Sequence, residues 1–212
     1  MSEFATFNAH PAAPVRAESP LAASRVGVAV QSSAQGAGVC IGERALLGHL
    51  ILRGKAADEG FRAGVEAALG VPLPLKLGPV ARDDARGVSV QWMSPDEWLV
   101  VVPEAQDHET ELRLRAALSG HYAVINVSGA QTLLELSGPA ARQVLMKSAG
   151  YDFHPSAFPV GKGISTTLAK STAVIRRTGE AQWELIIRRS FADYLYSWLL
   201  DASEEFGVFV AR

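Results

Sequence analysis

Apolar residues recur along the chain at two spacings, and these spacings predict strands followed by helices. An apolar run at 45–54 ends in a glycine and is typical of a strand. In the next stretch apolar side chains recur every fourth residue from Phe61 to Leu69, after acidic residues in the first turn and before Gly70, which predicts an amphipathic helix. Three prolines between residues 71 and 80 exclude a helix there and favour an extended segment.

A hairpin and a second helix are predicted next. Two runs rich in valine and tryptophan flank the sequence Ser-Pro-Asp at 94–96, and proline favours the second position of a turn, so two strands are expected around it. Residues 108–120 predict a helix that closes with a glycine. Leu112, Ala116 and Leu118 have the spacing of its apolar face.

The second part of the chain repeats this order. Residues 131–138 predict a strand ending in glycine, followed by a helix with Ser137 as its N-cap and Pro139 at its first helical position. Further strands are expected within residues 163–189, with a turn at 178–180.

The last strong pattern predicts a helix near the carboxyl end. Ser190 is the expected N-cap, because Asp193 follows three residues later as in a capping box. One apolar stripe is expected along this helix, formed by Phe191, Tyr194, Leu195, Trp198, Leu199 and Phe206.

The spacing of equivalent residues indicates a duplication. Gly54 and Trp98 are 44 positions apart, and Gly138 and Trp183 are 45 positions apart. The sequence therefore predicts an α+β fold made of two related β-α-β-β-α halves, about 43–122 and 123–212, that share one core about a pseudo-twofold axis.

Residues 1–42 differ from the rest and are interpreted as an extended N-terminal arm. Alanine, serine, proline and glycine dominate, and only the run at 25–30 resembles a strand. Such a segment is either a disordered tail or an arm that orders on something else. It lacks the continuous apolar stretch of a secretory signal, and no run long enough to span a membrane occurs in the chain.

Composition excludes some classes of partner. The 212 residues include 20 lysines and arginines and 22 aspartates and glutamates, a formal net charge of -2, so no basic field is available for nucleic acid. The single cysteine, Cys40, cannot form an intrachain disulfide, which fits a protein of the reducing cytoplasm.

Motifs that could carry chemistry are incomplete. The glycines at 36–42 lack dinucleotide-binding spacing and precede a predicted strand, which favours a flexible linker. Gly161-Lys162-Gly163 lacks the remaining residues of a phosphate-binding loop and favours a turn. No two of the five histidines have the spacing of a helical zinc pair, and His154, beside Asp152, favours a capping or packing role. No catalytic, cofactor-binding or metal-binding residue is therefore expected on this chain.

One cluster of charge remains open to two interpretations. Arg176 and Arg177 would lie on a strand neighbouring the one that carries Arg188 and Arg189. These arginines are either solvated strand ends or a docking site for an acidic partner or an anion. The tryptophans have core spacing, which favours packing: Trp92, Trp98, Trp183 and Trp198.

Four motifs, in order, carry a resemblance to a known family: LILRGKAADEGFRAGVEAALGVPLP, WMSPDEWLVVVP, LLELSGPAARQVLMKSAGYDFHPSAFPVGK and RRSFADYLYSWLLDASEEFG. Together they span most of residues 46–207 and resemble the gamma subunits of heterotetrameric sarcosine oxidases. The resemblance implies a fold similar to the folate-binding aminomethyltransferase (T-protein) domain of the glycine cleavage system.

The resemblance also implies a function for the whole complex. Enzymes of this family demethylate sarcosine oxidatively to glycine and hydrogen peroxide, passing the one-carbon unit to tetrahydrofolate or releasing formaldehyde. It implies alpha, beta and delta subunits as partners, with FAD, FMN, NAD and zinc bound on those subunits and no cofactor on gamma. Two alternatives stay open: a stand-alone tetrahydrofolate-dependent aminomethyl or one-carbon transferase, and a gamma-like subunit of a related N-methyl amino acid dehydrogenase.

Overall fold

The structure, a computed structural model, describes residues 17–24 and 35–211; the strand-like run at 25–30 lies outside them. The first half of the fold comprises β2 (Gly48–Arg53), α1 (Glu59–Leu69), β3 (Gly78–Asp83), β4 (Val88–Ser94), β5 (Glu97–Val102), α2 (Asp107–Ala117) and β6 (Ala123–Asn126). The second half comprises β7 (Gln131–Ser137), α3 (Ala141–Ser148), β8 (Lys162–Leu168), β9 (Ser171–Gly179), β10 (Gln182–Arg188), α4 (Ala192–Ser203) and β11 (Val208–Val210). A further strand, β1 (Val39–Arg44), precedes both.

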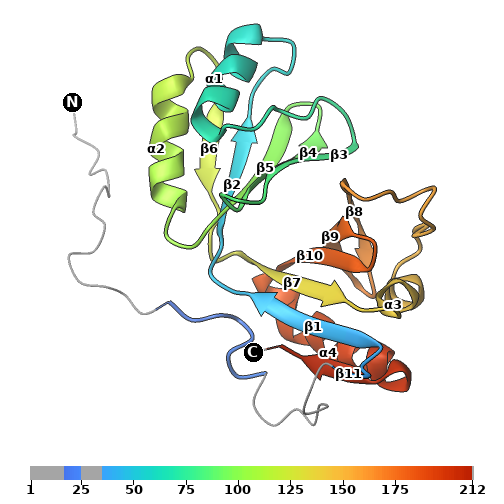
Figure 1. Cartoon of the computed structure of the whole chain (residues 1–212). Helices are drawn as coiled ribbons and strands as arrows, with labels where there is room; N and C mark the ends of the chain where they lie inside the picture. Colours follow the sequence, from blue (N-terminus) through green and yellow to red (C-terminus); the bar gives the residue numbers. More distant parts are fainter. Residues whose placement is uncertain (1–16, 25–34, 212) are drawn as a thin grey trace.

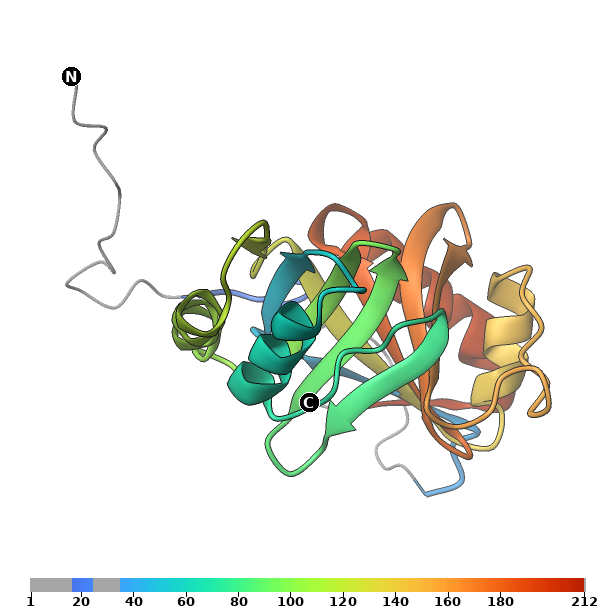
Figure 2. The ribbon, with the colours of Figure 1, turned by 90° about the horizontal axis from the view of Figure 1, so that it is seen from above.

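Within the described residues the strands form one eleven-stranded sheet, in the order β11-β1-β7-β10-β9-β8-β3-β4-β5-β2-β6. The sheet bends at the β3–β8 pair, where only Gly78 and Pro79 face Gly163 and Lys162. Its two parts face each other, with α1 and α2 on the outside of one and α3 and α4 on the outside of the other (Figures 1 and 2). The predicted α+β class with two related halves is confirmed.

Two strands, β1 and β6, each pair in the half opposite to the strand that follows them in the chain. β1 leads directly into β2, yet it lies between β7 and β11 in the second half's sheet. Correspondingly, β6 leads into β7 but pairs with β2 in the first half. The predicted boundary at 122/123 falls immediately before β6, and the predicted arm of residues 1–42 overlaps β1. The two crossing connections tie the halves together.

Three apolar clusters stabilise this arrangement. One lies between the first half's sheet and its helices and contains Phe61, Val65, Trp98 and Leu114; the second occupies the same place in the other half and contains Leu136, Phe153, Trp183 and Leu195. The third lies between the two halves and is shared by them, formed by Leu47, Leu99, Val101, Leu133, Val174 and Ile186. Since burial of apolar area is the dominant favourable term in folding, these clusters hold the layers together.

Local signals place α1 as predicted. The Asp58 carboxylate accepts a hydrogen bond from the Phe61 backbone N–H at 3.1 Å, and Gly70 ends the helix with a φ of 69°. Phe61, Val65 and Leu69 are buried. A capping carboxylate and a left-handed glycine at the end are sufficient to define this helix.

Three helix predictions need correction. α3 begins at Ala141, after Ala140, with no side-chain cap among the described residues, so Ser137 is not its N-cap and Pro139 precedes its first turn. Ser190 does not cap α4, because a short 3₁₀ turn over Arg189–Phe191 comes first. On α2 the buried residues are Thr110 and Leu114, with the predicted Leu118 buried at the C-cap, whereas Leu112 and Ala116 are exposed, so the buried face is displaced from the one that the spacing predicted.

Part of the N-terminal segment packs on the second half of the chain. Leu21 is fully buried in that half's core. The Ser19 hydroxyl donates to the Glu43 carboxylate, and Ser24 donates to Asp193 of α4 at 2.6 Å. The glycine-rich stretch that favoured a linker runs into β1, so the linker prediction is wrong from Val39 onward. None of the described helices is both long and apolar enough to cross a membrane.

Candidate functional site: a buried charge network between the halves

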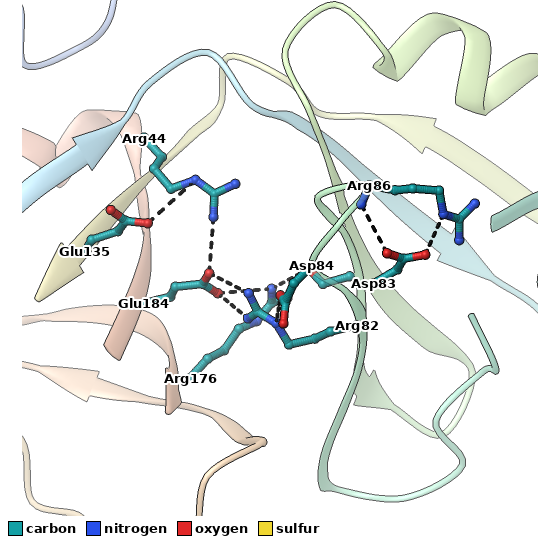
Figure 3. A network of polar contacts seen from close by, with 9 residues as sticks. Arg44, Arg82, Asp83, Asp84, Arg86, Glu135, Arg176 and Glu184 are labelled. Atoms are coloured by element: carbon teal, nitrogen blue, oxygen red, sulfur yellow. Dashed lines mark hydrogen bonds and ion pairs between the residues drawn. The ribbon is translucent and has the colours of Figure 1, made fainter. Parts of the chain in front are cut away.

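Charged side chains meet where the two parts of the sheet face each other (Figure 3). Arg176 of β9 lies opposite Glu184 of β10, and at the equivalent positions of the first half Gln91 of β4 lies opposite Leu99 of β5. Arg176 and Gln91, which occupy equivalent positions in the two halves, are in direct contact: the Arg176 Nε–H donates a hydrogen bond to Gln91 Oε1 at 2.7 Å. The Arg176 Nη1–H donates to the Ser89 hydroxyl at 2.8 Å. The two halves thus contact each other through duplicated strand positions.

Glu184 is the centre of the network. Arg82 of β3 donates to both of its carboxylate oxygens, at 2.8 and 2.9 Å. Arg176 lies 3.9 Å from Oε2, and Arg44 of β1 donates to Oε1 at 3.4 Å. Parallel hydrogen bonds from one guanidinium are the strongest form of this pairing. Three arginines from three different strands therefore surround one carboxylate.

The outer members of the network reach solvent. Arg82 also donates through Nε to Asp84 at 2.9 Å, and Arg44 lies 3.7 Å from the half-exposed Glu135. The recess beside Arg82 and Glu184 has a volume of about 40 Å³, enough for a few water molecules. A second recess, of about 170 Å³, is also lined by Glu184 and mainly by polar groups.

The surroundings fix the charge of each member. Burial alone would raise the pKa of Glu184, but the hydrogen bonds from Arg82 and the charges of the arginines outweigh it, so this pKa lies below its ordinary value. Burial lowers the pKa of Arg176 to about 10. The Glu184 carboxylate stays ionised at neutral pH with its oxygens engaged, and such a group is poorly suited to accept or donate a proton in catalysis.

His49 of β2 is a second buried titratable group on the inner face of the first half. It is fully buried, and its Nδ1 lies 3.0 Å from the carbonyl oxygen of Leu47. Burial lowers its pKa to about 4, against a smaller opposing effect of the Leu47 carbonyl. Its Nε2 contacts no hydrogen-bonding group among the described residues. His49 is therefore neutral at physiological pH.

The interpretation of the four arginines as solvated strand ends holds for only two of them. Arg188 and Arg189 are exposed, but Arg176 and Arg177 are buried at the opposite end of the hairpin. Arg177 donates to the carbonyl oxygens of Phe158, Gly179 and Glu180 and lies over the Trp183 ring. The antiparallel pairing of β9 and β10 separates Arg176 and Arg177 from Arg188 and Arg189. The end of β9 faces the start of β10, whereas Arg188 stands at the end of β10.

A sequence signal for the network existed. Arg176 follows Val174 and Ile175, and Glu184 stands between Trp183 and Leu185, so both charges interrupt apolar strand runs. A charge in such a run is buried if the strand is covered on both faces, and a buried charge needs a partner.

The remaining candidate residues do not assemble a reactive site. His154 Nδ1 lies 2.7 Å from the Ser156 hydroxyl, and Asp152 accepts the His154 backbone N–H, all within one exposed loop. Cys40 lies on β1 as a free thiol. Gly161 is in the loop before β8, as the predicted turn requires. In the part of the chain that the structure describes, no three histidine, cysteine, aspartate or glutamate residues are grouped to hold a metal ion.

A family model, a curated relative and a solved structure point to the same family. A family model described as "Sarcosine oxidase, gamma subunit family" matches residues 53–205. The sarcosine oxidase subunit gamma of an Arthrobacter species is 44% identical over 146 residues, covering 68% of this chain and 70% of that relative. A chain in the structure of heterotetrameric sarcosine oxidase from Corynebacterium sp. U-96, in complex with pyrrole 2-carboxylate, matches with a TM-score of 0.79 and 35% identity, covering 92% of this chain and 99% of that one.

A fourth likeness concerns the fold alone. The glycine cleavage system aminomethyltransferase T from Bartonella henselae has a TM-score of 0.60 to this chain at 20% identity, over 82% of this chain and 48% of that protein. The expected similarity to an aminomethyltransferase fold is confirmed.

Proposed function

Because this chain belongs to the sarcosine oxidase gamma subunit family, we propose that it is a non-catalytic structural subunit of a heterotetrameric sarcosine oxidase. The complex would demethylate sarcosine oxidatively to glycine and hydrogen peroxide and pass the one-carbon unit to tetrahydrofolate, or release formaldehyde without folate. In this proposal the flavins, NAD and zinc reside on the alpha, beta and delta subunits. The complex would act in the cytoplasm.

The observation that supports a structural role is that Glu184 is buried, ionised and paired with arginines. It is the one buried carboxylate among the described residues, and such a group in an enzyme core is the natural candidate for acid–base chemistry. Here its oxygens are engaged by Arg82 and approached by Arg44 and Arg176. The two recesses that adjoin it, of about 40 and 170 Å³, are smaller than ordinary small-molecule sites, which measure about 300–1,000 Å³. The network is suited to holding the two halves together.

Reconstitution tests the proposal. The other subunits are co-expressed with and without this chain, and sarcosine-dependent hydrogen peroxide formation is measured for each preparation and for this chain alone. The expected result is no activity from the chain alone, and an assembled, active complex only when the chain is present. Full assembly and turnover without this chain would refute the structural role.

The alternative of a self-sufficient folate-dependent transferase predicts a different outcome. The isolated chain would bind tetrahydrofolate, which calorimetric titration detects. We expect no heat of binding, because fold similarity to an aminomethyltransferase does not itself supply a folate site.

A further inference from the structure

A groove of about 540 Å³ opens where the two halves join. Its walls are residues 76–79, which enter β3, and residues 156–162, which enter β8, and these strands meet between the halves (Figure 1). Pro79 and Pro159 line it and supply no backbone N–H groups. We name this surface the junction groove.

Large apolar side chains are exposed at the junction groove. Leu77 and Val160 line it, one from each wall, and are 58% and 51% exposed. Single exposed apolar residues are ordinary, but two that face one groove from its opposite walls form a patch of the kind that marks interaction sites.

The charge of the junction groove is positive. Lys76 and Lys162 are its charged lining residues, and no carboxylate lines it. The Lys162 ammonium donates to the Ala157 carbonyl oxygen and lies over the rings of Tyr151 and Phe158. Among the described residues neither lysine has a carboxylate within ion-pair distance, whereas Arg44, Arg82 and Arg176 each lie within that distance of Glu184. A half-buried ammonium without a counter-charge is complementary to a carboxylate brought by another molecule.

We infer that the junction groove is the docking site for an extended segment of another subunit of the oxidase, one that places apolar side chains on Leu77 and Val160 and a carboxylate near Lys162. The inference rests on the proposed function, since it assigns a surface to the assembly proposed there. An extended segment fits because neither wall is helical: each runs from a loop into a strand, and the two strands pair where Gly78 and Pro79 face Gly163 and Lys162.

Co-purification of the complex tests this assignment. The full chain is co-expressed with the other subunits as wild type, as a Leu77→Ser and Val160→Ser double variant, and as Lys162→Glu. The matched control is Leu112→Ser, a 53% exposed leucine on α2, which does not line the groove. Each groove variant should reduce the amount of assembled complex by about tenfold or more, as loss of a central contact does. The control should assemble as wild type, and circular dichroism of each isolated chain should match wild type.

The outcomes separate the two proposals. If the wild-type chain does not assemble with the other subunits, the proposed function fails. If the wild type assembles and the groove variants assemble equally well, the docking site is wrong while the function stands. If the isolated chain forms a dimer that Leu77→Ser and Val160→Ser abolish, the occupant is a second copy and the inference is overturned.

Discussion

Arg82 and Glu184 are 102 positions apart in the chain and belong to opposite halves, yet they are joined by two parallel hydrogen bonds of 2.8 and 2.9 Å. The apolar cluster between the halves is non-directional and would tolerate sliding of one sheet over the other. A bidentate guanidinium–carboxylate pair has a defined geometry. This pair therefore selects one arrangement of the two halves.

Replacing Glu184 should destabilise the chain strongly. Glu184→Gln removes the negative charge that Arg82 and the buried Arg176 face, and breaking a buried pair from one side costs about 3–5 kcal/mol. Urea unfolding monitored by tryptophan fluorescence measures the loss. Glu135→Gln is the control, because this half-exposed carboxylate lies 3.7 Å from Arg44 and should change stability by less than about 1 kcal/mol. Equal effects of the two substitutions would refute a central role for Glu184.

His49 should make stability fall in mildly acidic solution. Its pKa is about 4 in the folded chain and 6.5 as the ordinary value, so between these pH values the unfolded chain binds a proton that the folded chain does not. The contribution is therefore fully present above pH 6.5 and is lost as the pH falls toward 4, by about 3 kcal/mol in total. When the free energy of unfolding is measured across this pH range, it should fall less steeply with decreasing pH for His49→Gln than for the wild type. His154→Gln, at an exposed position, is the control. A pH dependence in His49→Gln equal to that of the wild type would contradict the argument.

The sequence predicted the elements whose signals are local. α1 carries its cap at Asp58, its periodic apolar face and its terminal Gly70 within a dozen residues, and the hairpin turn at 94–96 is equally compact. The sheet positions of β1 and β6 were not predicted, because each of these strands pairs with a strand 70 or more residues away in the chain. Pattern alone identifies a strand and not the sheet that it joins.

The charge network was missed for a related physical reason. Arg176 and Arg177 are adjacent in sequence, but alternate residues of a strand point to opposite faces. One enters the space between the halves and pairs with Glu184, and the other packs on Trp183. Recognising this required knowing that both faces of β9 are covered, which follows only from the arrangement of the halves.

The segment around Leu21 should contribute to the stability of the folded chain. Leu21 is fully buried in the second half's core, so Leu21→Ala removes buried methyl groups and should cost about 2–5 kcal/mol. Leu75→Ala, at an exposed position, is the control and should cost less than about 0.5 kcal/mol. Thermal unfolding of both variants measures the difference. A Leu21→Ala chain as stable as the control would show that this segment does not pack on the core in solution.

Two glycines of α1 should respond oppositely to alanine. Helix propensity favours alanine over glycine by about 1 kcal/mol at both positions. At Gly64, however, a Cβ would lie 2.6 Å from the backbone carbonyl oxygen of Ala117, where α2 ends, so the helices must separate. At Gly60 the nearest atom is the capping oxygen of Asp58 at 3.3 Å, the end of a side chain that needs to shift by only a few tenths of an ångström. Gly64→Ala should therefore lower the free energy of unfolding by about 1–3 kcal/mol, as overpacking does, while Gly60→Ala should leave it unchanged or raise it. Urea unfolding of the two variants decides the matter, since a stabilised Gly64→Ala chain would mean that α1 and α2 are not in the close contact described.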